Sequence, residues 1–132
     1  MSNNHDANIK LLYPVDKNLF FTVDDIGLGK EFDCILNVEM GEDVHEVLTG
    51  DRVRVGIVNL TQSKAVGPVQ DIPRALPPGT GPRLEEIRVE IPGGWEADAA
   101  VGDVLQAVAS YKVEFGVNVD FSTAQSVTFV VS

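Results

Sequence analysis

Hydrophobic and polar residues alternate with a period of two along several stretches of this 132-residue chain, and the longest stretch runs from Val104 to Val131. In its first limb, which ends at Phe115, every second residue is apolar, so these side chains share one face of a strand. The same alternation runs from Val127 to Val131. This period is typical of a strand with one buried face. Gly116 and Asn118 between the limbs tolerate turn conformations, so the stretch predicts a long β-hairpin.

Shorter stretches with the same alternation predict strands at residues 8–13, 19–23, 31–40, 51–60 and 84–91. The stretch from Glu31 to Met40 is the clearest, because its apolar residues all share one face: Phe32, Cys34, Leu36, Val38 and Met40. Pro14 is expected to end or edge the first strand, since proline cannot donate to a ladder. Residues 24–30 predict a turn, and residues 42–48 have the spacing of a single helical turn.

Residues 61–83 differ from the rest of the chain because they contain five of its seven prolines. We expect an irregular edge segment or a short edge strand at residues 66–72, because proline is confined to the edges of sheets. An extended, polyproline-like loop is expected to follow through the sequence ALPPGTGP.

About seven strands, few helical patterns and no alternation of strands with helices predict an all-β fold. We predict a single antiparallel β-sandwich over residues 1–132, with residues 1–7 loose. The order of the strands resembles that of immunoglobulin-like and fibronectin type III domains, with Tyr111 where an aromatic residue of strand F would fall. The resemblance implies an immunoglobulin-like sandwich without its disulfide, because Cys34 is the only cysteine. A jelly roll or a transthyretin-like sandwich would show much the same pattern.

The chain carries 20 acidic and 10 basic residues, for a net charge of -10. This charge repels phosphates and anionic lipids, so neither nucleic acid nor membrane is expected as a partner. Ten of the carboxylates precede residue 47, which predicts an electronegative region if they share a surface. No apolar run has the length of a signal peptide or of a membrane span, and we therefore expect a soluble, cytoplasmic protein.

A cluster of potential metal ligands occupies the connection between the strands at 31–40 and 51–60: Glu42, Asp43, His45 and Glu46. Carboxylates in loops can bind calcium, and a histidine with a carboxylate can bind zinc. The spacing matches no calcium-loop pattern and only one histidine lies nearby, so we expect a solvated surface and no metal or other cofactor.

Catalysis by a pair of carboxylates is the leading enzymatic alternative, because two acids from separate segments can share a proton and activate water. The candidate residues are Asp24, Asp25, Asp43 and Asp51. Adjacent acids on a strand point to opposite faces, and the Asp-Thr-Gly signature of aspartic proteases is missing.

Three features favour binding over catalysis. Leu76, Pro77 and Pro78 offer apolar groups on a restricted backbone, which could dock a partner at low entropic cost. Edge strands offer unpaired backbone groups for β-augmentation or symmetric pairing. Trp95 could stack on a sugar if it is exposed, and would belong to the core if it is buried.

We therefore predict a non-enzymatic interaction or assembly module that binds a protein partner and associates with itself. Its expected contact surface is the proline-rich segment together with an edge strand. The alternatives are a small hydrolase with a carboxylate pair and a weak metal-binding or carbohydrate-binding module.

Overall fold

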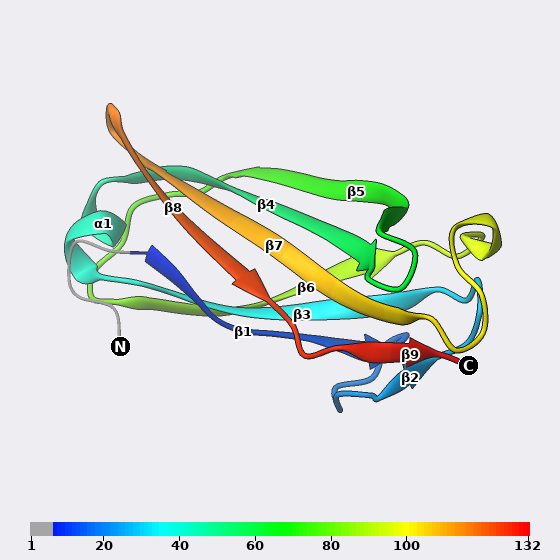
Figure 1. Cartoon of the computed structure of the whole chain (residues 1–132). Coiled ribbons are helices and arrows are strands. Elements are labelled where there is room, and N and C mark those ends of the chain that lie inside the picture. Colours follow the sequence, from blue (N-terminus) through cyan, green and yellow to red (C-terminus); the bar gives the residue numbers. More distant parts are fainter. Residues whose placement is uncertain (1–6) are drawn as a thin grey trace.

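The computed structural model describes residues 7–132, which fold into two facing β-sheets (Figure 1). The smaller sheet is antiparallel and has the strand order β1-β3-β6, made of β1 (Ala7–Asp16), β3 (Phe32–Met40) and β6 (Arg83–Ile91). The larger sheet has six strands in the order β2-β9-β7-β4-β5, with β8 also paired to β7. Its strands are β2 (Asp25–Ile26), β4 (Leu48–Asn59), β5 (Lys64–Ala75), β7 (Val104–Phe115), β8 (Asn118–Gln125) and β9 (Phe129–Val131).

Alternate side chains of both sheets form the shared interior, which confirms the predicted all-β sandwich. Val53, Val55 and Ile57 of β4 are buried, whereas Arg52 and Arg54, which alternate with them, point outward. At one end of the sandwich, aromatic rings close the interior by edge-to-face packing: Phe32 with Trp95 at 6.3 Å and with Phe129 at 5.8 Å.

The strands predicted at 31–40, 51–60, 84–91 and in the first limb of the hairpin are confirmed, as is the helical turn, which is α1 (Glu42–Glu46). A short 3-10 helix, η1 (Glu96–Asp98), follows β6. The described residues contain no helix with the length and apolar character needed to cross a membrane.

Of the two predicted roles for Pro14, the edge role is confirmed, because β1 lies at the edge of its sheet and continues past Pro14 to Asp16. The carbonyl of Pro14 accepts from the backbone N–H of Val23, on the side away from β3. The nitrogen of Pro14 points to the same open side as its carbonyl. Its lack of an N–H therefore removes no hydrogen bond between β1 and β3. Ala7 begins this strand rather than a loose terminus, and residues 1–6 lie outside the described part of the chain.

The segment at 61–83 is more regular than expected, because β5 is a strand of 12 residues. It pairs only with β4 and lies at the edge of the larger sheet, as the prolines predicted. Gly67 has a positive φ of 64°, and the β4–β5 register shifts between Val55 and Ile57. This irregularity takes up Pro68 without breaking the strand.

The predicted strand at 19–23 is wrong, since only an isolated bridge joins Thr22 to Val15. The predicted turn at 24–30 contains the two residues of β2. The hairpin that begins with β7 turns already at Gly116 and Val117, and residues 118–125 form β8.

Residues 17–23, which we name the strap, run over the outer face of the smaller sheet. Asp33, Ile35 and Val15 are all fully buried although they alternate with core residues and so point away from the shared interior. The strap covers this outer face and is tied to it by a hydrogen bond: the backbone N–H of Asn18 donates to the Asp33 carboxylate at 3.0 Å. In Figure 1 the strap is the blue loop below β9 and β2.

Candidate functional site

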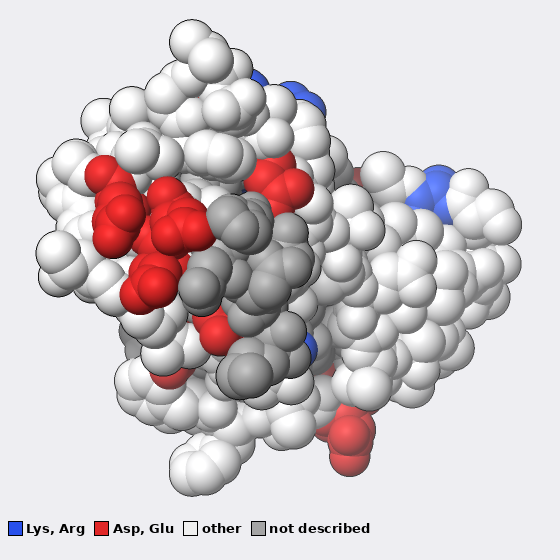
Figure 2. Space-filling model, turned by 90° about the vertical axis from the view of Figure 1, so that its left-hand side faces the viewer, with Lys and Arg blue, Asp and Glu red and all other residues white. Residues whose placement is uncertain are grey.

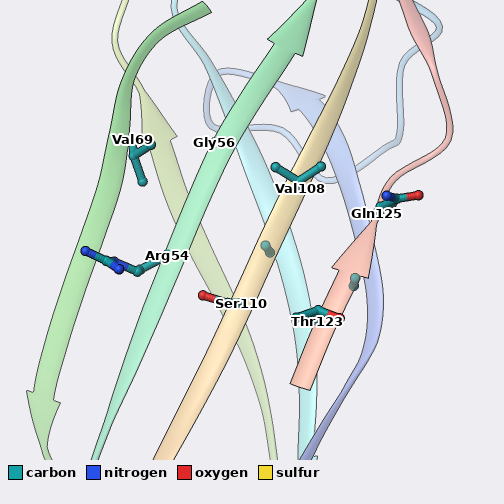
Figure 3. A pocket seen from close by; sticks show the side chains of 9 residues that line it. Arg54, Gly56, Val69, Val108, Ser110, Thr123 and Gln125 are labelled. Carbon is teal, nitrogen blue, oxygen red and sulfur yellow. The ribbon is translucent and has the colours of Figure 1, made fainter. Parts of the chain in front are cut away.

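A wide concavity lies on the outer face of the larger sheet and has a volume of about 720 Å³. It spans four strands, β5, β4, β7 and β8, as Figure 3 shows. We name it the hollow, and its lining residues are Arg54, Gly56, Val69, Val108, Ala109, Ser110, Thr123, Ala124 and Gln125.

Gly56 makes the floor of the hollow, because it is an outward position of β4 that carries no side chain. It pairs with Val108 of β7, while Val69 of β5 lies on its other side (Figure 3). A Cβ at position 56 would lie 3.6 Å from a methyl of Val69 and 3.8 Å from a methyl of Val108. These are ordinary contact distances, so one added carbon would touch both valines, which border the floor with apolar surface.

Basic residues continue from the hollow along the same sheet face: Arg54 lines the hollow, and Arg52 and Lys112 pair with each other two residues further along β4 and β7. We name these three residues and their partners the rim. Arg52 and Arg54 share one carboxylate, that of Asp71, with N–O distances of 2.8 Å and 3.5 Å. Lys112 on the neighbouring strand pairs with Glu114 at 3.2 Å. Three cations and two carboxylates therefore surround this face, which leaves a positive surplus on a chain whose net charge is -10.

The chemistry of the hollow suits binding rather than catalysis. Ser110 and Thr123 supply hydroxyls, Gln125 supplies an amide, and Arg54 is the only ionisable residue among the nine that line it. Activation of a hydroxyl nucleophile needs a base within hydrogen-bond reach. No lining residue can act as that base, since the set contains no histidine or carboxylate.

Asp51 is enclosed in a network within the sandwich, not in a carboxylate pair. Its side chain has no exposed surface; it accepts from Arg74 Nε at 2.8 Å and from the hydroxyl of Tyr111 at 2.6 Å. Arg74 also donates to Glu85 of β6 at 2.6 Å, so the network joins the two sheets.

The network shifts the pKa values of Glu85, Arg74 and Tyr111. Hydrogen bonds from Arg74 lower the pKa of Glu85, and those from Arg74 to Asp51 and Glu85 raise the pKa of the guanidinium. Burial, followed by the hydrogen bond to Asp51, raises the pKa of Tyr111. Asp51 is enclosed by the guanidinium of Arg74 and the hydroxyl of Tyr111, and these contacts give it a structural role within the sandwich.

The remaining candidate carboxylates do not meet Asp51. Asp25 lies in β2, whose neighbour β9 pairs with β7 at Val104, whereas Asp51 faces Val113 of β7. Nine residues of strand separate these positions, which corresponds to about 30 Å. Asp24 adjoins Asp25, and Asp43 is exposed on α1. Asp24 and Asp25 therefore lie far along the larger sheet from Asp51.

The weak metal-site alternative at Glu42, Asp43, His45 and Glu46 finds no support in residues 7–132, where no group of three or more His, Cys, Asp or Glu side chains could hold an ion. His45 instead fixes the proline-rich loop, with its Nδ1 at 2.9 Å from the carbonyl of Gly81. Figure 2 looks at the end of the sandwich that carries α1 and shows carboxylates gathered there. Part of the expected electronegative region therefore exists, and the exposed Asp43 and Glu46 of α1 belong to this end.

The predicted binding residues of the proline-rich segment are only partly accessible. Pro77 and Pro78 are exposed, whereas Leu76 packs against the core and donates its N–H to Thr49. Trp95 is 3% exposed and its indole donates to the carbonyl of Lys30 at 2.9 Å. It belongs to the core, and the ring is not available to stack on a sugar.

Cys34 is likewise fully buried in the interior, where burial raises the pKa of its thiol to about 12. The thiol is therefore uncharged and acts as a small apolar group, in agreement with its position on the apolar face of β3.

Sequence reasoning missed the strap as a possible contact element. Leu19, Phe20 and Phe21 are 52%, 66% and 84% exposed, and we name these three residues the strap tip. Arg88 of β6 holds the tip in place, since it donates to the carbonyl of Leu19 and its guanidinium lies 4.8 Å from the ring centre of Phe20. Three adjacent apolar residues beside Asn18 were the available signal.

Asp33 anchors this arrangement from below. It accepts from Arg88 Nη1 at 2.6 Å, and Lys17 lies 3.6 Å away. Burial alone would raise the pKa of Asp33, but the N–H of Asn18 and the charges of Arg88 and Lys17 outweigh it and lower the pKa below its usual value. The strap is thus tied to the smaller sheet by an ionised carboxylate.

No family model and no curated protein matches the chain. One solved structure that resembles it is described as "Crystal structure of putative beta-galactosidase from bacteroides fragilis", with a TM-score of 0.43 and 16% sequence identity. The match covers 90% of this chain and 17% of that one, so this chain spans less than a fifth of its length. A likeness of this size says nothing about what the present chain binds.

Proposed function

We propose that this protein is a non-enzymatic interaction module that binds an extended segment of a protein in the hollow. The single observation that carries the proposal is a large, open concavity whose lining has apolar walls, hydroxyl and amide groups and an arginine, but no base. Binding surfaces combine apolar contact with a few polar groups that fix orientation, and this lining fits that description.

The shape and charge of the hollow favour a particular kind of segment. It crosses several strands of an exposed sheet face, so it admits an extended chain rather than a compact molecule. Val69 and Val108 would contact apolar side chains, while the positive surplus at Arg52 and Arg54 would attract carboxylates. The expected ligand is therefore a peptide segment that carries both apolar and acidic residues.

The predicted edge strand takes part in this surface, because Val69 belongs to β5. The strand order also supports the proposed immunoglobulin-like arrangement. Sheets of that class place strands A, B and E on one side and strands C, F and G on the other, which corresponds to β1-β3-β6 opposite β4, β7 and β9.

Selection of short random peptides displayed on phage, with the purified protein as bait, tests the proposal. We expect enriched peptides to contain acidic and apolar residues and to compete with one another. Gly56→Trp should weaken the binding of a synthetic copy of such a peptide at least about tenfold, because the indole fills the floor of the hollow. Gly56→Ala adds a methyl at ordinary contact distance and is the matched control.

Two outcomes would contradict the proposal. One is the failure to enrich any peptide over a bait-free selection. The other is enrichment of peptides that bind the Gly56→Trp protein as tightly as the unaltered protein, which would place their site elsewhere.

A further inference from the structure

We infer that the segment bound in the hollow is the strap tip of a second copy of this chain. The outer face of the smaller sheet of one copy then lies against the outer face of the larger sheet of the next. This inference rests on the proposed function of the hollow and names its ligand. It joins two features of the described surface, the hollow and the exposed apolar strap tip.

The strap tip has the properties of an anchor for a protein interface. Phe20 and Phe21 are adjacent and largely exposed, and Leu19 extends the apolar surface. Large apolar side chains that insert into a pocket supply most of the binding energy of many interfaces. The contacts of Arg88 with Leu19 and Phe20 hold the backbone before binding, which reduces the entropy lost on association.

Charge complementarity favours the strap tip as the ligand. The strap begins after Asp16 and ends before Asp24 and Asp25, and all three carboxylates are exposed. The rim of the hollow has the opposite balance, because Arg52 and Arg54 share a single carboxylate. Two cations, Lys17 and Arg88, also lie beside the tip, but both pair with the carboxylate of Asp33, so the charge that remains around the tip is acidic. An apolar segment with acidic surroundings is the kind of segment that the hollow is proposed to bind.

The placement of the two features requires two molecules. The strap lies on the outer face of the smaller sheet, and the hollow lies on the outer face of the larger sheet, with the shared interior between them. The strap is tied down by Asp33 and Arg88, so it does not reach the far face of its own molecule. Because the contact joins two different surfaces, every pair of copies keeps one free strap tip and one free hollow. Further copies can add at both ends.

Complementation between two defective variants tests the inference in the whole chain. Phe20→Ser/Phe21→Ser removes the tip and keeps the hollow, whereas Gly56→Trp fills the hollow and keeps the tip. Sedimentation velocity should show each variant alone as a monomer, and their equimolar mixture as a dimer, because only one productive contact remains. The unaltered protein should form longer species at the same concentration.

Controls separate this effect from general loss of apolar surface or of structure. Val117→Ser removes a fully exposed apolar side chain from the β7–β8 turn and should leave association unchanged. Arg54→Glu reverses a charge on an exposed side chain at the rim and serves as a second variant with a defective hollow. Far-ultraviolet circular dichroism establishes that each variant is folded.

The inference is overturned if the unaltered protein stays monomeric at high concentration, if the mixture stays monomeric, or if either variant associates like the unaltered protein. Peptides that bind the hollow without any self-association would leave the proposed function intact. In that case the ligand is a segment of another protein, so the two failures are distinguishable.

Discussion

At the scale of single residues, Asp33 carries more of the structure than its place on an outward face of β3 would indicate. Its carboxylate is fully buried and organises Arg88, Asn18 and Lys17 around the strap. Removal of one partner from a buried ion pair leaves the other without compensation, which is costly even where the pair itself adds little.

We predict that Asp33→Asn lowers the free energy of unfolding by about 3 kcal/mol, at the lower end for buried pairs because Arg88 keeps some solvent contact. Urea unfolding followed by the fluorescence of the buried Trp95 measures the change. Glu90→Gln is the matched control, since Glu90 pairs with Lys17 but its side chain is 74% exposed. Its effect should stay below about 1 kcal/mol, and equal effects of the two substitutions would refute the role given to Asp33.

The same carboxylate predicts how stability depends on pH. The pKa values of Asp33 and Glu85 are lowered in the folded protein, from ordinary values of 3.8 and 4.5. Groups of this kind stabilise the fold fully above their unfolded pKa and lose that contribution as pH falls through the folded pKa. Urea midpoints should therefore be steady down to about pH 5 and fall below it. Asp33→Asn should flatten this acid limb, and an unchanged limb would exclude Asp33 as a cause.

The sequence places Asp33 on the correct face of β3 but does not reveal its burial. The alternation from Phe32 to Met40 identifies which side chains point outward. It says nothing about what covers them, because Asn18 and Arg88 come from positions 15 and 55 residues away. Asp51 escapes prediction for the same reason, since Tyr111 is 60 residues distant.

At the scale of elements, β4 contains two glycines with different surroundings. A Cβ at Gly50 would lie 2.7 Å from the backbone carbonyl oxygen of Arg74, which belongs to the neighbouring strand. A Cβ at Gly56 would meet only side-chain methyls at 3.6 Å or more. Gly50 permits the close approach of β5, whereas Gly56 leaves space on the surface of the sheet.

We predict that Gly50→Ala destabilises the fold by about 1–3 kcal/mol, because β5 has to shift to relieve the overlap. Gly56→Ala should change stability by less than about 0.5 kcal/mol. Urea midpoints of the two variants check this difference. Amide hydrogen exchange should be faster in β5 of the Gly50 variant, and equal stability of the two proteins would contradict the assignment.

The sequence predicts a strand where its apolar residues face the core. It fails where polar residues point inward and apolar residues point outward. In β8 the residues Asp120 and Ser122 point inward and accept the backbone N–H groups of Ala7 and Ile9, while Phe121 is 63% exposed. Polar side chains thus cap the edge of β1 from the other sheet. The sequence pattern of β8 is therefore inverted, and a rule that looks for apolar residues on the core face does not predict this strand.

At the scale of the whole molecule, the hollow could not be derived from the sequence, because its lining extends from Arg54 to Gln125 over four strands. The sequence gives the net charge of the chain but not the sign of the charge at the rim. The excess of acids predicted a repulsive surface overall, whereas the register brings Arg52, Arg54 and Lys112 side by side on one sheet face. This local surplus determines how association should respond to salt.

We predict that sodium chloride weakens self-association of the unaltered protein. The Debye length falls from about 10 Å at 0.1 M to about 3 Å at 1 M, which screens the attraction between the basic rim and the acids beside the strap tip. The dissociation constant from sedimentation should rise several-fold over this range and should not fall, as it would if salt mainly relieved repulsion between copies of charge -10. Arg54→Gln should associate more weakly and depend less on salt, because part of the attraction is already absent. Tighter association at high salt in both proteins would show that apolar contact alone joins the copies, and the rim would then have no part in choosing the partner.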